Sequence, residues 1–409
     1  MRILHTSDWH LGRTLHGHSR AAEHEAFLDE LVDVATDVDL VLISGDVFET
    51  TNPPIEAEEL LFDALARLGD GGRRAVVVIA GNHDSPDRLK APGPLTASHA
   101  VWILGRPGDV PRPRRPSEPG VRLAEGRPSV LVLDLPCGER AVVAAVPYPS
   151  EARLRQMLSP VLDERSVQAA YEQRIAGLFA ELSASFRPEA VNLATSHLAV
   201  SSCMPSSSER ALIGGAWQVA GSVLPAGAQY TALGHLHLAQ QVPDAPSLAR
   251  YAGAPLAMRF SERDFPRNHV LIDVAPGGAP AVELVPISAG RPLVEWTVQS
   301  LEEVERGVAD GLHPNAFVDL RLRVDARLTH AEVARIKRLP RDFVRIRTIL
   351  PESVVTPLLD PARRRELPLN DLFTAFYRDQ TGHEPEAELT TLLLELASNP
   401  EPGDERAVG

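Results

Sequence analysis

The chain has 409 residues, a length that predicts about two or three domains of roughly 150 residues each. With 44% hydrophobic and 23% charged residues, its composition is typical of a soluble globular protein, and no stretch approaches the ~20 apolar residues of a membrane span. Ser7 and Asp8 interrupt any apolar segment of a signal peptide. The two cysteines, Cys137 and Cys203, lie too far apart to indicate a disulfide framework. We therefore expect a cytoplasmic protein with no membrane partner.

The formal net charge is −14. Neutralisation of phosphates by basic residues dominates the affinity of proteins for DNA, so this charge argues against a protein that holds nucleic acid by its overall electrostatics. Two ways around this objection stay open. Divalent cations can invert the local charge of an acidic site, or a partner can supply the basic surface.

In the first two-thirds of the chain, short apolar runs alternate with helical patterns, which indicates α/β layering. The predicted elements are strands at 2–6, 40–44, 75–80, 191–195 and 230–233 and helices at 21–38 and 54–68, with Pro54 as the first helical residue. The segment 105–120 is rich in Pro and Arg and is interpreted as a loop insertion.

Composition changes near Pro276, where Gly-Gly-Ala-Pro predicts a linker. Beyond it, the pattern predicts a small α+β domain with strands at 293–298, 316–324 and 343–350 and helices at 301–312 and 330–339. Two short amphipathic helices follow, with Gly382 and Pro385 in the turn between them. We expect domains at 1–275, 285–352 and 367–397, and a disordered tail at 399–409 that starts at Asn399.

Five of the predicted strands end in residues of types that bind metal ions. These residues are Asp8 and His10, Asp46, Asn82, His197, and His235 with His237. Each alone has a simpler explanation as a turn or structural residue. Because ligand sites in α/β sheets gather at the carboxyl ends of strands, their joint occurrence favours one site. A set of His, Asp and Asn without a thiolate suits Mn²⁺, Fe²⁺ or Zn²⁺.

Two cations ~3.5–4 Å apart can clamp the attacking and leaving oxygens of a phosphoryl displacement and acidify a bridging water. We assign Asp8, His10, Asp46 and His237 to one ion, and Asp46, Asn82, His197 and His235 to the other. His83 then binds neither ion and is suited to protonate the departing 3′-oxygen, with Asp84 orienting its imidazole. The remaining histidines considered, His5, His16, His18, His24 and His99, are interpreted as core or surface residues, with substrate contact by His16 and His18 as a weaker alternative.

These motifs resemble those of the calcineurin-like metallophosphoesterases. Flanking stretches narrow the resemblance to the nuclease subunits of bacterial SbcCD exonucleases, within the double-strand-break repair nucleases; the stretches are 5–12, 44–48, 208–210 before 214–215, 230–237 and 251–256. The resemblance implies a β-sandwich flanked by helices, followed by a small α+β capping domain and a C-terminal helical pair. Glu49 departs from the family pattern, in which Asp or His follows the Gly-Asp motif, and receives no role.

The resemblance also implies an activity. It is that of a Mn²⁺-dependent nuclease with 3′→5′ exonuclease activity on double strands and endonuclease activity on single strands and hairpins, acting in DNA end processing, recombination and repair. It further implies a homodimer within a heterotetramer that contains an SbcC-type coiled-coil ATPase. ATP would bind only to that partner, and the complex would associate with the nucleoid when it acts on DNA.

The C-terminal region holds candidate contact residues. Apolar residues of the helical pair are predicted to dock the ATPase: Leu372, Phe373, Phe376, Leu389, Leu392, Leu393 and Leu396. Packing of the two helices on their own domain is the alternative. Arg321, Arg323, Arg345 and Arg347 alternate with apolar residues, so each strand would present its arginines on one face. That face is interpreted either as a phosphate-contacting patch or as an ordinary solvated surface.

Two other functions stay open. The first is a metallophosphoesterase of a nucleotide or small phosphodiester, which would need neither a capping domain nor docking helices. The second is a non-catalytic scaffold, which would be expected to have lost metal ligands, whereas the predicted set is complete.

Overall fold

A computed structural model of the chain describes residues 1–113, 120–149, 164–206, 209, 217–350, 368–381 and 384–398. The predicted tail at 399–409, part of the 105–120 loop, and most of the stretch from Ser208 to Gly215 lie outside these residues. The chain divides into two compact units, one of Met1–Glu295 with His313–Asp319, the other of Trp296–Leu312 with Leu320–Gly409. No helix in the described part combines the length and apolar character that a membrane crossing requires.

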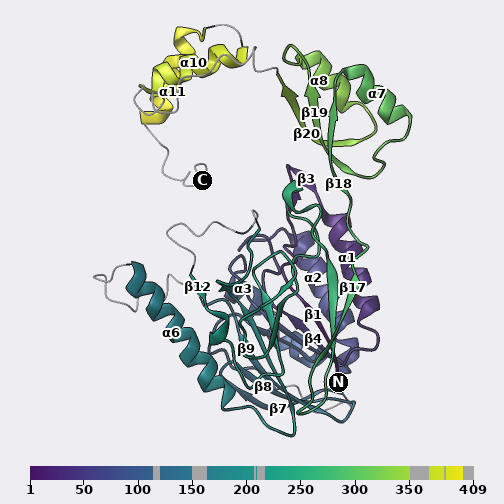
Figure 1. The fold of residues 1–409 in the computed structure, drawn as a ribbon, viewed down its shortest axis with the longest axis vertical. Helices are drawn as coiled ribbons and strands as arrows, with labels where there is room; N and C mark the ends of the chain where they lie inside the picture. Colours follow the sequence, from purple (N-terminus) through teal and green to yellow (C-terminus); the bar gives the residue numbers. More distant parts are fainter. Residues whose placement is uncertain are drawn as a thin grey trace. The chain divides into compact units, whose positions relative to one another are not determined.

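The first unit contains a six-stranded sheet (Figure 1). Its strands, in spatial order, are β17 (Ala281–Pro286), β16 (Asn268–Asp273), β1 (Arg2–Thr6), β4 (Leu40–Ile43), β5 (Ala75–Ile79) and β6 (Val101–Leu104). The run from β1 to β6 is parallel, and β16 and β17 are antiparallel additions at one side. All residues of β4, β5 and β6 are buried, as expected for parallel strands covered on both faces.

A seven-stranded sheet packs against the first. Its strands are β14 (Gln240–Gln241), β15 (Leu248–Tyr251), β13 (Tyr230–Gly234), β10 (Val191–His197), β9 (Arg140–Val146), β8 (Val130–Asp134) and β7 (Arg122–Arg127). The central strands β15, β13, β10 and β9 are parallel. The core between the sheets takes alternate residues of each strand, such as Leu40 and Leu42 from one sheet and Val143 and Leu193 from the other.

Helices cover the two outer faces. Helices α1 (Ala21–Val34) and α2 (Ile55–Leu68) bury Phe27, Leu31 and Leu61 against the six-stranded sheet. Helix α6 (Glu164–Ser183) buries Tyr171 and Phe179 against the seven-stranded sheet. Full burial of such a side chain stabilises the fold by about 1.5–3 kcal/mol. The result is a sandwich of two sheets between helices, which confirms the predicted fold class.

Smaller elements complete the first unit. They are β2 (Thr14–Leu15), β3 (His18–Ser19), β11 (Ala199–Val200), β12 (Gln218–Val219), α3 (Pro86–Lys90), α4 (Gly93–Thr96), and the 3₁₀ turns η1 (Asp70–Gly72), η2 (Ala97–His99), η3 (Gly221–Val223) and η4 (Phe260–Glu262). None of these short elements was predicted, because two to five residues carry too little periodicity to be recognised.

Two predictions about local structure are wrong. Pro54 is the N-cap of α2, with extended backbone at φ −65° and ψ 154°, and not its first helical residue. The Gly-Gly-Ala-Pro stretch after Pro276 is the turn of the β16–β17 hairpin and not a linker, since Asp273 pairs with Ala281. Glycine and proline favour tight turns and linkers alike, so composition alone did not separate the two.

The second part of the chain has the predicted β-α-β-α-β order, with β18 (Leu293–Val298), α7 (Leu301–Ala309), β19 (Phe317–Arg323), α8 (His330–Lys337) and β20 (Asp342–Ile349). The strands form a sheet in the order β18-β19-β20. Thr329 begins α8 with a capping box to Glu332. Helices α10 (Leu369–Thr381) and α11 (Ala387–Ser398) follow and contact each other.

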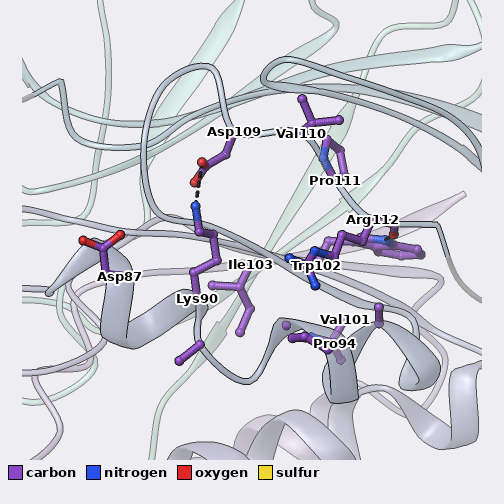
Figure 2. Close-up of a pocket in the computed structure, with 13 residues that line it drawn as sticks. Asp87, Lys90, Pro94, Val101, Trp102, Ile103, Asp109, Val110, Pro111 and Arg112 are labelled. Atoms are coloured by element: carbon purple, nitrogen blue, oxygen red, sulfur yellow. Dashed lines mark hydrogen bonds and ion pairs between the residues drawn. The ribbon is translucent and has the colours of Figure 1, made fainter.

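The described part of the 105–120 loop forms no helix or strand and packs beside α3, α4 and β6. A pocket of about 320 Å³ lies between these elements, and within it Lys90 Nζ lies 2.7 Å from Asp109 Oδ1. Figure 2 shows the residues that line this pocket. Trp102 donates from Nε1 to the carbonyl oxygen of Arg112 on the same loop. The lining residues shown there include none of the predicted metal ligands.

Candidate metal centre

The strand ends meet because the parallel strands run in register. Thr6 of β1 pairs with Ile43 of β4, which pairs with Val78 of β5, and His197 of β10 pairs with Gly234 of β13. Polar residues that follow these strands therefore reach the same edge from both sheets. The structure brings Asp8, His10, Asp46, Asn82, His83, His197, His235 and His237 together there, although a separation of 227 residues lies between Asp8 and His235.

Four of the predicted ligands adopt left-handed backbone. The φ angles are 55° at Asp8, 49° at His10, 48° at Asp46 and 104° at His235. Such values cost about 1–3 kcal/mol each for residues with a side chain, and they persist only where surrounding contacts hold them. The loops after β1 and β4 supply such contacts, because Asp8 N donates to Gly45 O and His10 N donates to Asp46 O, each at 3.0 Å.

Two motif glycines allow this close approach. A Cβ on Gly81 would lie 2.1 Å from Asp46 Oδ1, and a Cβ on Gly45 would lie 2.5 Å from His197 Nδ1. Gly45 also has a φ of +92°, which favours glycine. Because these two glycines have no side chain, the loops that carry the predicted ligands can contact one another.

The first ligand group contains Asp8, His10 and His237, whose ligand atoms all lie within 4.8 Å of one another. His10 Nε2 lies 3.2 Å from His237 Nε2 and 3.7 Å from Asp46 Oδ2. Asp8 is held by Ser7 Oγ at 2.6 Å and by the backbone N–H of His235 at 3.0 Å. The three side chains are almost completely buried.

The second group contains Asp46, Asn82, His197 and His235. Asn82 Oδ1 lies 3.0 Å from His197 Nε2 and 2.9 Å from His235 Nδ1. His197 Nε2 also lies 3.4 Å from Asp46 Oδ2, while its Nδ1 donates to Ser44 O at 2.8 Å. Asp46 thus lies between the two groups, as the assignment of two ions requires.

The donor set fits two divalent cations. His10 Nδ1 faces the Glu49 carboxylate, and its Nε2 faces His237 Nε2 at 3.2 Å, so that two imidazole nitrogens and the Asp8 carboxylate converge as a divalent cation would need. Burial opposes protonation of His197, but the Asp46 carboxylate outweighs it and raises the pKa of His197 to about 9. A cation bound at His197 Nε2 would replace the proton that this raised pKa favours in the metal-free chain.

His83, predicted to act as an acid, lies beside the two ligand groups. Its Nδ1 donates to the backbone carbonyl of Glu49 at 2.7 Å, which leaves Nε2 available, and its ring lies 4.8 Å from that of His10. Its backbone N–H donates to Asp46 Oδ1 at 2.8 Å. The side chain is half-buried and thus reachable by substrate.

The structure assigns the orientation of His83 to a different group from the predicted Asp84. The Asp84 carboxylate instead accepts hydrogen bonds from the backbone N–H groups of Gly81 at 2.8 Å, Phe48 at 2.9 Å and Val47 at 3.2 Å. Through these bonds Asp84, which is 4% exposed, connects the loop after β4 with the loop after β5. The carbonyl of Glu49 takes the place expected of Asp84.

Sequence reasoning missed several residues behind the ligands. Glu49, to which no role was given, lies 2.9 Å from His10 Nδ1 and pairs with Arg13. Glu262 Oε1 lies 3.7 Å from His237 Nδ1. The Tyr148 ring lies 6.1 Å from that of His197. Glu49 follows the Gly-Asp motif by three residues, which was the one available signal; Glu262 and Tyr148 belong to no recognisable motif.

The predicted arginine patch is more buried than expected. Leu320 and Leu322 of β19 are buried as the alternation requires, with Arg321 half-buried and Arg323 exposed. On β20, Arg345, Ile346 and Arg347 are all half-buried, so strict alternation does not hold there. Arg321 and Arg347 each have an interaction partner.

The predicted docking residues lie on α10 and α11. Leu389 and Leu392 are exposed, at 38% and 50%, and Leu372, Phe373 and Leu393 are half-buried. The Phe373 ring lies 5.8 Å from that of Tyr377. The side chains of Phe376 and Leu396 lie outside the described part of the chain.

Comparison with known proteins identifies the family of the chain. The family described as calcineurin-like phosphoesterase matches residues 1–119, which carry the first three metal motifs. The SbcD component of the SbcCD nuclease from Bacillus subtilis is 39% identical over 99% of this chain and 100% of the relative. The SbcD proteins of Rhodobacter capsulatus and Escherichia coli K12 are 33% and 28% identical, over 86% and 80% of this chain and 88% and 78% of the relatives. The chain therefore belongs to the SbcD family of SbcCD nuclease components, which confirms the resemblance drawn from its motifs.

Proposed function

We propose that this protein is a Mn²⁺-dependent DNA nuclease that cleaves double strands as a 3′→5′ exonuclease and single strands and hairpins as an endonuclease. Membership of the family makes it a hydrolase of phosphodiester bonds. The observation that carries the proposal is the convergence of two ligand groups around Asp46, with His83 beside them. The oxygen and imidazole donors suit Mn²⁺, and Fe²⁺ or Zn²⁺ would also fit.

The chemistry divides between the cations and the side chains. Two bound cations would neutralise the charge of the scissile phosphate and acidify the attacking water. His83 Nε2 carries the proton for the departing 3′-oxygen, since Nδ1 is already committed to the Glu49 carbonyl. The backbone N–H of His83 donates to Asp46 Oδ1, and the bond from Nδ1 to the Glu49 carbonyl orients the ring beside this shared carboxylate.

The proposal includes partners. The net charge of −14 favours a complex in which a second protein adds basic surface for DNA. The relatives are named as components of SbcCD, so we propose an SbcC-type ATPase that binds the ATP, and a homodimer of this chain within a heterotetramer. The exposed Leu389 and Leu392 of α11 support docking of that partner through the helical pair. The complex would act in the cytoplasm, at the nucleoid.

The residue-level test compares the wild type with His83→Gln on end-labelled duplex and hairpin DNA with Mn²⁺, with and without the ATPase. Loss of general acid catalysis predicts a fall in the cleavage rate of about 10²–10⁴-fold. Mn²⁺ binding should be retained, because His83 is assigned to neither ion. The matched control is His99→Gln, which alters an exposed histidine and should cleave like the wild type.

Two outcomes would contradict the proposal. Equal cleavage by the wild type and His83→Gln would remove the acid role of His83. Failure of the wild type on every DNA substrate, together with turnover of a small phosphodiester such as a cyclic nucleotide, would replace the nuclease by the alternative phosphodiesterase function.

A further inference from the structure

Three side chains behind the first ligand group form a continuous brace. The first is Glu49, whose Oε2 lies 2.9 Å from His10 Nδ1. The loop carrying Glu49 is bound to the loop carrying His10, because Leu11 N donates to Val47 O and Glu49 N donates to Leu11 O. A carboxylate behind a metal-binding imidazole fixes its tautomer and its orientation and increases its basicity.

Arg13 is the second member. Its Nη1 lies 2.8 Å and 2.9 Å from the two carboxylate oxygens of Glu49, and its Nη2 donates to the carbonyl of Met258 at 3.4 Å. Arg13 is largely buried, with 16% of its side chain exposed, so solvent screens this ion pair only in part. Arg13 thus connects the loop after β1 with the segment before η4.

The third member, Glu262, closes the connection. Its Oε2 accepts the backbone N–H of Met258 at 2.7 Å, and its Oε1 lies 3.7 Å from His237 Nδ1 and accepts from Ser206 Oγ at 2.6 Å. Glu262 is 2% exposed. The contacts run from His10 through Glu49, Arg13, Met258 and Glu262 to His237, whose Nε2 is back within 3.2 Å of His10 Nε2.

The second ligand group has weaker support. His197 Nδ1 donates to the neutral carbonyl of Ser44, and the oxygen ligand from Asn82 is a neutral amide. By contrast, the first group adds the Asp8 carboxylate to the shared Asp46 and has carboxylates behind both of its histidines. Ligand charge and ligand basicity both increase the affinity for a divalent cation.

We infer that Glu49, Arg13 and Glu262 form a positioning brace that fixes both histidine ligands of the ion at Asp8, and that this ion is consequently held more tightly than the ion at Asn82. The inference rests on the two-ion assignment of the proposed function. It predicts that the two ions load in sequence as the metal concentration rises, with the ion at Asp8 first.

The test is a titration of the metal-free full chain with MnCl₂, in which free Mn²⁺ is measured by its electron paramagnetic resonance signal. The wild type should show two classes of site. Asn82→Ala assigns the weaker class, since it removes a ligand of that ion. In Glu49→Gln and Arg13→Gln the tighter class should lose about 10–100-fold in affinity, the usual effect of removing such a supporting contact, while the weaker class is unchanged.

The controls separate positioning from folding and from substrate binding. Arg187→Gln removes a comparable ion pair, to Glu125, and should bind Mn²⁺ like the wild type. Arg13→Lys keeps the positive charge but lacks the guanidinium that bonds both Glu49 and the Met258 carbonyl, and it should recover part of the affinity. Thermal unfolding of each metal-free variant identifies any that fails to fold. If Arg13→Gln is one of these, Glu49→Gln and Arg13→Lys still decide the question.

Three results would overturn the brace. They are an equal loss in both classes of site, no loss in either class, and an unchanged Mn²⁺ affinity of Arg13→Gln with a raised KM for DNA, which would make Arg13 a substrate contact. Mn²⁺ binding is measured without DNA, and nuclease activity is measured with DNA. Failure of the brace proposal is therefore distinguishable from failure of the nuclease proposal.

Discussion

Substitution of Asp84 tests whether this carboxylate, which is next to His83 in sequence, stabilises the fold or acts on His83. Hydrogen bonds to a charged acceptor contribute about 1.5–3 kcal/mol each, so the short bonds from Gly81 and Phe48 together stabilise the fold by about 4 kcal/mol. Burial and the Asp46 carboxylate raise the pKa of Asp84 to about 6, a cost that offsets part of this gain. We therefore expect Asp84→Ala to lower the free energy of unfolding by about 3 kcal/mol.

The assay is urea or thermal unfolding of the metal-free chain, where a loss of this size in a large domain corresponds to a fall of about 8 °C in Tm. Asp84→Asn should lose nearly as much, because its amide group turns N–H donors towards backbone N–H donors. Asp87→Ala is the control, since that exposed carboxylate pairs with Arg106 at the surface and contributes little. An unchanged Tm combined with a collapse of kcat would show instead that Asp84 acts on His83 directly.

Two further expectations follow from the packing. Gly81→Ala should weaken Mn²⁺ binding by at least about 100-fold, because a Cβ 2.1 Å from Asp46 Oδ1 must displace the shared carboxylate; Gly177→Ala, which meets open space within α6, should bind normally in the same titration. Burial and Arg20 lower the pKa of His24 to about 4. Neutral His24 therefore contributes fully to the free energy of unfolding above pH 6.5, and this contribution is lost as pH falls towards 4. Between pH 7 and pH 5, titration of His24 should lower the free energy of unfolding, measured in urea, by about 2 kcal/mol. A His24→Gln variant with the same pH dependence as the wild type would contradict that expectation.

The pattern of strand ends predicted which polar side chains gather at one edge of the two sheets, since buried parallel strands are long, apolar and end in the same place. What lay beyond sequence reasoning was the direction of individual side chains. Asp84 follows His83 in sequence, yet its carboxylate turns to the backbone of the β4 loop. Glu262 and His237 come together only when η4 packs beside the strand-end loops.

The division of strands between the two sheets was likewise not readable from the chain. Both sheets contain parallel, fully buried strands, so β5 and β10 look alike in sequence. The β16–β17 hairpin was mistaken for a linker because the alternation of β17 is weak, with four of its six residues exposed. Only the three-dimensional pairing shows that this hairpin extends the first sheet.

The position of the metal centre at the meeting edge of the two sheets has a mechanical consequence. Each ligand group joins residues that follow strands of one sheet to residues that follow strands of the other, as Asp8 and His10 meet His237. The unfolded chain offers no such arrangement, so the binding energy of each cation adds to the stability of the packed sheets. Under the two-ion proposal, each ion would act as a crosslink between the two sheets, and removal of metal would lower the free energy of unfolding of the chain.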